Sequence, residues 1–245
     1  MHVLITRPES DAAALRGELE ALGHTVSVEP LLTIRALPVP ADAVEDIAAL
    51  VATSRNGLRA LTESAAFPAA RKLPLIAVGP GTASLARELG FTRVTVGKGT
   101  GADLVPIIAA TARELGRPIA HVRGKDVAFD LRRAVQGQGV DLREIVSYEA
   151  IPADRFEPGT RDLIASGVIN AVILMSPRTG SIFSRLARAD GLAKAAQSLG
   201  FLCLSPAVAA TVEPLGPTRV EIAESPDAAA MLAAVTRVAT LWSGV

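Results

Sequence analysis

Short apolar runs alternate along the chain with longer segments in which apolar residues recur at helical spacing. The clearest runs are residues 2–6, 25–29, 50–54, 75–79, 93–97, 119–123, 171–175, 201–205 and 219–223. Runs of this length and composition are typical of strands, most of them buried on both faces. Strands that alternate with helices form parallel sheets with helices packed against them. The pattern therefore predicts an α/β protein.

Local signals mark several helix ends. Gly23 follows an apolar helical pattern and is the expected glycine just beyond its C-terminus. Thr100 stands three residues before Asp103, which is the spacing of a capping box. In "ESPDAAAMLAAV" we expect Ser225 to be the N-cap of the last helix, with Pro226 directly after it.

Three segments from the first half of the chain recur in the second half. The pairs are "ITRPESDAAALRGELEALGHTV" with "HVRGKDVAFDLRRAVQGQGVDL", "TSRNG" with "MSPRTG", and "LIAVGPGTASLARELGFTRVTV" with "LCLSPAVAATVEPLGPTRVEI". If these three kinds of segment are called A, B and C in the order given, the chain reads A-B-C-A-B-C, which indicates two similar α/β units. A cut near Leu115 would give the simplest partition. The pattern also allows a partition in which the first A belongs with the last B and C.

The composition narrows the classes of function. Apolar residues make up 49% of the 245 residues, which is enough for a sizeable core, and only 3% are aromatic. The 25 basic residues equal the 25 acidic ones, so the net charge is zero. Nucleic-acid-binding proteins usually carry a basic surplus, so we expect no nucleic-acid partner. An anionic ligand would have to meet a local cluster of arginines.

Cysteine and histidine usage points to a reducing compartment and to no metal site. The single cysteine, Cys203, cannot form a disulfide within the chain, and no metal-ligand spacing is present. The segment "MHVLITRPES" begins with a strand pattern and lacks the features of a signal peptide. No apolar stretch reaches the roughly 18 residues of a membrane span. We therefore expect a cytoplasmic protein that does not bind membranes.

Hydroxyl, glycine and basic residues follow most of the predicted strands. The candidate site residues are Thr6, Arg7, Ser54, Arg55, Asn56, Gly79, Thr82, Arg123, Lys125, Ser176, Pro177, Arg178 and Ser205. Ligands of open parallel sheets bind beyond the carboxyl ends of the strands. Helix N-termini, short hydroxyls and guanidinium groups suit carboxylates or phosphates. We call each group of such residues at the end of a strand a corner. Helix capping explains any single corner, but the repetition of corners favours a polyanionic small molecule as the ligand.

A nucleotide site is the weaker interpretation. The segment "GKGTGA", from Gly97 to Ala102, matches the loose G-x-G-x-x-A pattern. Its counterpart in the repeat has no glycine, and no acidic residue ends the next strand, where a ribose contact is expected. The segment "GPGTAS" lacks the Gly-Lys-Ser/Thr ending of a P-loop. No Ser/His/Asp set, activated cysteine or close carboxylate pair stands out either.

Tyr148 is the only tyrosine and lies in "REIVSYEAIPAD". That segment resembles "SVEPLLTIRALPVP", residues 27–40. Each contains a proline, which favours extended backbone before it. Paired together, the two could form a two-stranded link between the units. Tyr148 is then either a packing residue of that link or part of a ligand site beside a hinge.

Six motifs in their order resemble uroporphyrinogen-III synthase along nearly the whole chain. They are "LITRPE", "VATSRNGLRAL", "IAVGPGTASLARELGF", "VSYEAIP", "LMSPRTGSIF" and "VEIAESPDAAAMLAAV". The resemblance implies two flavodoxin-like parallel-sheet domains joined by a two-stranded antiparallel linker. It implies a discontinuous first domain, residues 1–36 and 152–245, and an inserted second domain, residues 37–151.

The resemblance also implies an activity, that of a cyclising lyase in tetrapyrrole biosynthesis (heme, siroheme, cobalamin or chlorophyll). Hydroxymethylbilane, a linear tetrapyrrole with eight carboxylates, would lose water and close to uroporphyrinogen III with its terminal pyrrole ring inverted. No cofactor or metal is implied, and we expect a monomer. The family's linker tyrosine maps onto Tyr148, which would assist departure of the hydroxyl.

A polycarboxylate agrees with the repeated corners, because each unit could hold part of one many-armed anion. One position departs from the family pattern, since Val208 stands where the other unit keeps Thr82 and no hydroxyl contact is possible there. The competing interpretation is a non-catalytic two-lobed binder of a polycarboxylate or a tetrapyrrole.

Overall fold

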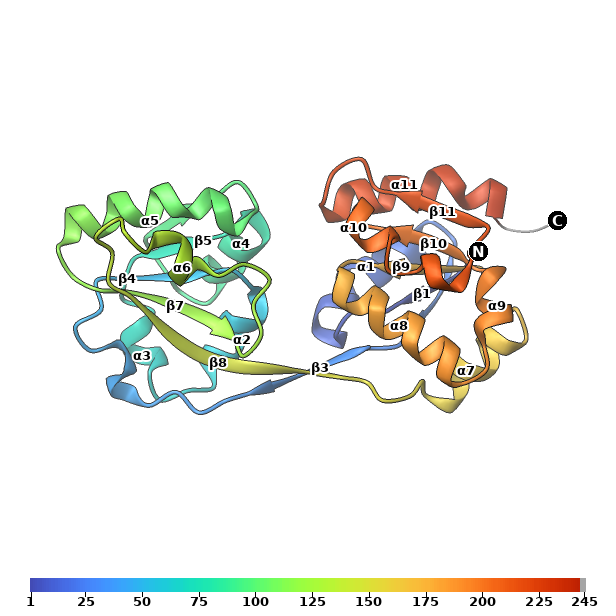
Figure 1. Cartoon of the computed structure of the whole chain (residues 1–245), viewed down its shortest axis with the longest axis horizontal. Coiled ribbons are helices and arrows are strands. Elements are labelled where there is room, and N and C mark those ends of the chain that lie inside the picture. Colours follow the sequence, from blue (N-terminus) through green and yellow to red (C-terminus); the bar gives the residue numbers. More distant parts are fainter. Residues whose placement is uncertain (243–245) are drawn as a thin grey trace. The chain divides into compact units, whose positions relative to one another are not determined.

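The computed structural model describes residues 1–242 and divides the chain into two compact units (Figure 1). The first unit combines Met1–Thr33 with the C-terminal part of the chain from Ile151. The second unit is the segment Ile34–Ala150. Each unit is built around its own sheet.

The first unit has a five-stranded parallel sheet in the order β11-β10-β9-β1-β2. Its strands are β1 (His2–Ile5), β2 (Thr25–Val28), β9 (Ala171–Leu174), β10 (Gly200–Cys203) and β11 (Arg219–Ile222). This is the strand order of flavodoxin-like sheets, whose direction of winding reverses between the first and third strands. The switch point of this sheet therefore lies between β1 and β9.

Helices cover both faces of the first sheet (Figure 1). One face packs against α1 (Glu9–Ala21) and α11 (Ala228–Trp242). The other packs against α7 (Pro158–Ala165), α8 (Pro177–Ala189), α9 (Ala193–Gln197), α10 (Pro206–Ala209) and the 3-10 helix η2 (Glu213–Leu215). Successive strand residues alternate between these faces, as strand geometry requires. Cys203 is fully buried on the α8 face, and burial raises the pKa of its thiol to about 12.

The second unit has a six-stranded sheet in the order β3-β8-β7-β4-β5-β6. Its strands are β3 (Leu32–Ala36), β4 (Ala49–Ala52), β5 (Leu75–Ala77), β6 (Val94–Val96), β7 (Ile119–Gly124) and β8 (Leu142–Pro152). The strands from β8 to β6 are parallel. Counted along the chain, these five strands lie in the order 3-2-1-4-5, the other common doubly wound order, with the switch point between β7 and β4. When β7 and β8 are matched with β1 and β2 of the first unit, the two sheets have the same spatial arrangement of strands.

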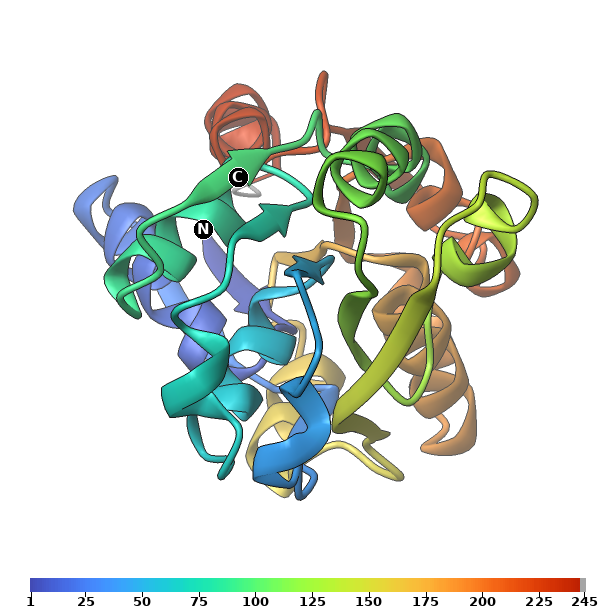
Figure 2. The same ribbon diagram turned by 90° about the vertical axis from the view of Figure 1, so that its left-hand side faces the viewer.

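Helices also cover both faces of the second sheet (Figure 2). One face packs against α5 (Gly101–Leu115) and α6 (Leu131–Val135). The opposite face packs against the 3-10 helix η1 (Ala41–Val44), α2 (Arg55–Thr62), α3 (Phe67–Ala70) and α4 (Pro80–Glu88).

Strands β3 and β8 pair where the chain passes from one unit to the other. The Leu37 amide donates to the Ser147 carbonyl at 2.8 Å, and the Ala153 amide donates to the Leu31 carbonyl at 3.0 Å. Residue numbers fall along one strand as they rise along the other, so this pair is antiparallel.

Every strand predicted from the apolar runs is present, and the sheet order assigns the repeated segments. Strands β1 and β2 pair with β9 to β11, whereas β7 and β8 pair with β4 to β6. The first A segment therefore lies with the last B and C segments. Of the two partitions that the sequence pattern allows, the sheets adopt the one in which both chain ends build one unit.

Two of the three predicted helix ends are confirmed, and one is wrong. Gly23 has φ +81°, and its amide donates to the Glu20 carbonyl at 2.9 Å, as in a Schellman motif. Thr100 and Asp103 form the capping box. Ser225 is not the N-cap of α11. The Asp227 carboxylate accepts the Ala230 amide at 2.9 Å instead, and the Ser225 hydroxyl donates to that carboxylate.

None of the helices within residues 1–242 has the length and apolar character needed to cross a membrane.

Candidate functional site

The carboxyl ends of the parallel strands gather the candidate residues into two sets, one in each unit. In the first unit they follow β1, β9 and β10: Thr6, Arg7, Ser176, Pro177, Arg178 and Ser205. In the second unit they follow β4 and β5 or lie at the end of β7: Ser54, Arg55, Asn56, Gly79, Thr82, Arg123 and Lys125. Tyr148 lies within β8, opposite Gly124, the last residue of β7. Parallel pairing explains the gathering, because all carboxyl ends of such a sheet lie at one edge.

Two helices begin at the switch points and carry hydroxyl caps. Ser54 is the N-cap of α2, and its oxygen accepts the Asn56 amide at 3.1 Å. Ser176 is the N-cap of α8, and its oxygen accepts the Thr179 amide at 3.2 Å. The remaining amides of each first turn and the helix dipole favour an anion at these N-termini. Helix capping and anion binding are thus compatible at both corners.

The corners at Gly79 and Ser205 carry no such cap. Gly79 precedes α4 and Ser205 precedes α10, and neither makes a side-chain capping bond. Any ligand contact at Gly79 would use the backbone. Val208 is 1% exposed, so the residue that replaces the expected threonine belongs to the core of its unit.

Three candidate residues of the two sets already serve the fold. Thr6 is fully buried, and its hydroxyl donates to the Ile173 carbonyl at 2.8 Å, which ties the end of β1 to β9. Thr82 is 7% exposed. The Arg7 guanidinium pairs with the Asp11 carboxylate of α1 at 3.1 Å.

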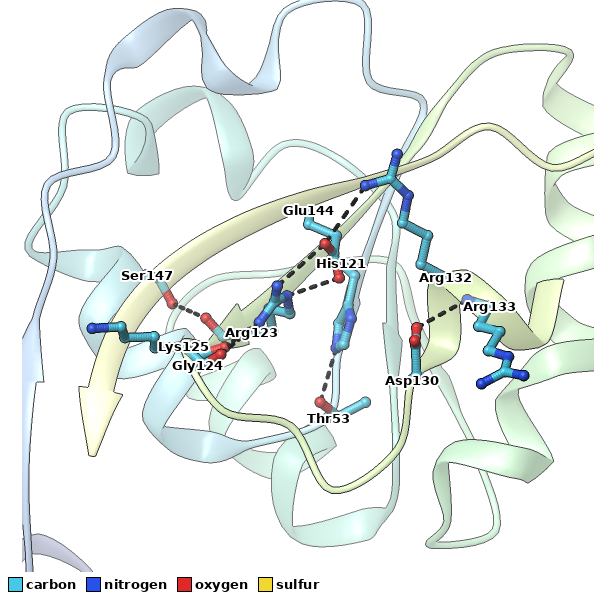
Figure 3. Close-up of polar contacts among 10 residues, drawn as sticks. All are labelled: Thr53, His121, Arg123, Gly124, Lys125, Asp130, Arg132, Arg133, Glu144 and Ser147. Atoms are coloured by element: carbon cyan, nitrogen blue, oxygen red, sulfur yellow. Dashed lines mark hydrogen bonds and ion pairs between the residues drawn. The ribbon is translucent and has the colours of Figure 1, made fainter. Parts of the chain in front are cut away.

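Arg123 has its charge compensated within its own unit (Figure 3). Its Nη2 donates to Glu144 Oε2 at 3.2 Å, and its Nε lies 2.8 Å from Oε1, although that contact lacks hydrogen-bond geometry. Its Nη1 donates to the backbone carbonyls of Gly124 at 2.8 Å and Lys125 at 2.9 Å. The side chain is only 17% exposed, so little of its charge faces solvent.

Lys125 and Arg35 form an exposed cationic pair around Glu149. Glu149 Oε2 accepts from Arg35 Nη2 at 2.5 Å, and Oε1 accepts from Lys125 Nζ at 3.1 Å. These hydrogen bonds, that from Arg35 first, lower the pKa of the Glu149 carboxyl. Arg35 is not among the site residues predicted from the sequence. The available signal was that residues 27–40 and the Tyr148 segment are matching extended stretches, which brings Arg35 opposite Glu149.

Tyr148 is half-buried against two glycines. A Cβ on Gly124 would lie 2.7 Å from Cζ of the tyrosine ring, and one on Gly57 would lie 3.7 Å from its Cε1. The ring therefore occupies the space that these residues leave open. Its hydroxyl makes no hydrogen bond with the part of the chain that the structure describes. That hydroxyl is therefore available to a ligand.

His121 is a buried polar residue that is not among those predicted from the sequence. It is 1% exposed, and its Nε2 lies 2.9 Å from Thr53 Oγ1 (Figure 3). Burial lowers its pKa to about 4, helped by the nearby Arg123 and partly opposed by Glu144. Its imidazole is therefore neutral at physiological pH and serves as a hydrogen-bonding core residue.

The assembled groups can bind carboxylates and donate one proton. Hydroxyls, amides and basic side chains supply donors in each unit, and the second unit also has the phenol hydroxyl of Tyr148. Within residues 1–242, no three His, Cys, Asp or Glu side chains are grouped so that they could hold a metal ion.

Two flavodoxin-like units, each with helix N-termini and basic residues at the carboxyl end of its sheet, define a class of α/β proteins suited to anionic small molecules. A family model described as "Uroporphyrinogen-III synthase HemD" matches residues 13–233. The chain therefore belongs to the uroporphyrinogen-III synthase family, whose members are cyclising lyases.

Solved structures of similar proteins share the fold. The chain is similar to uroporphyrinogen-III synthetase from Helicobacter pylori, with 14% identity, a TM-score of 0.67, and coverage of 97% of this chain and 99% of that one. It is also similar to a mutant uroporphyrinogen III synthase from Thermus thermophilus, with 19% identity, a TM-score of 0.56, and coverage of 98% and 99%. A comparison with curated protein sequences gave no significant match.

The lowered pKa of His121 predicts a loss of stability in mild acid. The unfolded chain binds a proton at this residue below pH 6.5, whereas the folded protein does so only near pH 4. The contribution of neutral His121 to the free energy of unfolding is therefore fully present above pH 6.5 and decreases as the pH drops toward 4. The loss from this group is up to roughly 3 kcal/mol.

Urea midpoints followed by circular dichroism from pH 7 to pH 4 measure this loss. His121→Gln should flatten the profile in that window, and His24→Gln, at a turn of the first unit, should keep most of the slope. A His121→Gln profile as steep as that of the unsubstituted protein would contradict the assignment.

Proposed function

We propose that this chain closes hydroxymethylbilane to uroporphyrinogen III. The observation that carries the proposal is the family match across residues 13–233. That match favours a synthase over a non-catalytic binder of the same ligand. The site geometry supports it independently, because a substrate with eight carboxylates needs many donors and the strand ends of both units provide them.

The corner residues would bind carboxylates of the substrate. The N-termini of α2 and α8, capped by Ser54 and Ser176, offer backbone amides. Lys125 is 65% exposed and Arg35 is 62% exposed, so both can extend to a flexible side arm. Their shared partner Glu149 neutralises part of their positive charge, so their attraction for a carboxylate is moderate. A moderate attraction suits a ligand that must be released after the reaction.

The reaction needs few protein groups because the substrate supplies the driving force. Electrons from the pyrrole nitrogen expel the hydroxyl from the adjacent carbon, and water leaves once a proton is donated to that oxygen. The substituted carbon of the terminal ring then attacks this electrophilic carbon and becomes a spiro centre. The older bond from that ring carbon to its methylene breaks, and the methylene bonds instead to the unsubstituted α-carbon of the same ring, which loses a proton; the macrocycle is then closed with the ring inverted. Holding the substituted carbon against the electrophilic carbon is a matter of orientation. The Tyr148 phenol would donate the proton.

Three further features belong to the proposal. The two compact units would be domains of residues 1–36 with 152–245 and of residues 37–151. The protein would be a monomer, since one chain supplies both sets of corner residues. It would work in the cytoplasm, which suits a chain whose single cysteine, Cys203, is a buried free thiol.

The product isomer tests the activity directly. Purified protein is incubated with freshly generated hydroxymethylbilane, the products are oxidised, and the uroporphyrin isomers are separated. Uncatalysed closure gives the symmetric type I ring, so we expect mostly type III in the presence of the protein. Only type I from folded protein would reject the synthase and leave an anion binder.

Tyr148→Phe should lower turnover by roughly ten- to a hundredfold without abolishing it, because one proton donor is lost while orientation is kept. The phenylalanine keeps the ring that packs on Gly124 and Gly57, so circular dichroism should be unchanged. Single-turnover rates and the isomer ratio are the measurements.

Two outcomes of that experiment would count against the proposed role. Complete loss of turnover in a folded variant would show that the tyrosine is essential and that orientation alone explains too little. Unchanged turnover would remove Tyr148 from the chemistry.

A further inference from the structure

A β-bulge lies directly beside Tyr148. Strands β7 and β8 pair in regular register up to Arg123, which faces Val146, but Gly124 then faces Tyr148. Ser147 is therefore an extra residue of β8 at this point. An extra residue breaks the alternation of side chains between the two faces of a sheet, and bulges beside functional sites can re-aim a side chain in this way.

The bulge turns Tyr148 toward α2. Leu142 of β8 packs on the face covered by α5 and α6, and regular alternation would place every second residue after it, Tyr148 included, on that face. The structure instead places both Ser147 and Tyr148 on the α2 face. The Ser147 hydroxyl donates to the Gly57 carbonyl of α2 at 3.1 Å, and the Tyr148 ring borders Gly57.

Arg123 holds the irregular backbone at the bulge. Its Nη1 bonds the carbonyls of Gly124 and Lys125, the two residues that follow it. The Lys125 amide in turn donates to the Tyr148 carbonyl at 2.9 Å. A chain of short contacts thus runs from the guanidinium through the end of β7 to the backbone of the tyrosine.

Glu144 fixes the guanidinium in that position. It contacts Nε at 2.8 Å and Nη2 at 3.2 Å (Figure 3). It lies on β8, the strand that also carries Tyr148. Without it, a guanidinium that is 17% exposed would lack a counter-charge at short range. Arg132 Nη1, at 3.8 Å from Glu144, is a more distant and exposed partner.

Gly124 leaves room for the re-aimed ring. A Cβ at this position would lie 2.7 Å from Cζ and 3.0 Å from the hydroxyl oxygen of Tyr148. Both distances are shorter than ordinary contacts between such atoms, so any side chain there would push the ring away.

We propose that Arg123 and Glu144 are positioning residues that stabilise the bulge and thereby aim Tyr148 at the N-terminal part of α2. Arg123 then acts through the tyrosine and is not itself a ligand of the substrate. The orientation of the ring stands on the contacts above. Its consequence for turnover rests on the proposed function.

The experiment compares Arg123→Met with the matched control Arg143→Met. Arg143 lies on β8, the strand of Tyr148, is 50% exposed, and pairs with Asp141 at 3.8 Å. Tyr148 is the only tyrosine, so ring-labelled tyrosine gives a single NMR signature. Arg123→Met should shift that signature toward the values of free tyrosine and weaken its contacts to Gly57. Arg143→Met should leave both unchanged.

Kinetics separate positioning from substrate binding. Arg123→Met should lower kcat to near that of Tyr148→Phe and leave KM within about twofold. The double variant should be no slower than Arg123→Met alone, since residues that act through one another are not additive. A raised KM with an unmoved ring signature would overturn the proposal and make Arg123 a substrate ligand.

Two further variants keep the test decisive. If Arg123→Met does not fold, Glu144→Gln keeps the shape of the pair, and Gly124→Ala displaces the ring directly. Both should move the tyrosine signature in the same direction, and a native signature in folded Glu144→Gln protein would overturn the proposal. If Tyr148→Phe proves fully active, the proposed proton donor fails, while the ring signature still decides the positioning claim.

Discussion

Parallel strand pairing is the constraint on which the rest of this structure depends. Because the strands of each flavodoxin-like set run in one direction, segments far apart in sequence end at the same edge of a sheet. Ser54 and Lys125 share an edge in the second unit because β4 and β7 are parallel neighbours. Thr6 and Ser176 follow the neighbours β1 and β9 in the same way. The repeated corners therefore follow from the topology of the sheets, and each unit has one set of them.

Charge at these edges is balanced locally. Glu144 compensates Arg123, and Glu149 bridges Arg35 and Lys125. A site of this kind can hold a polycarboxylate through many modest contacts, which agrees with a net charge of zero. It also agrees with a reaction in which orientation does most of the catalysis. One irregular feature, the bulge at Ser147, then decides where the single phenol points.

Much of the fold follows from local sequence, and less of the site does. Apolar runs predict the strands, and Thr100 predicts a capping box, because these signals act over a few residues. Asp227 displaced Ser225 as a cap because both are good N-caps and only the backbone geometry chooses between them. The ion pair between Arg123 and Glu144 forms because β7 pairs with β8. The bulge arises because Ser147 has no partner on β7. The periodicity of apolar residues along one sequence does not specify strand register or contacts between distant residues.

The central claim is that substrate carboxylates bind at the carboxyl ends of the parallel strands. Amide chemical shifts of ¹⁵N-labelled protein, titrated with uroporphyrin III as an unreactive eight-carboxylate probe, test it most directly. The account predicts that the largest shifts fall at residues 54–57, 124–125 and 176–179, with few at the opposite ends of the strands. Shifts confined to the opposite ends, or to the outer faces of the helices, would contradict it.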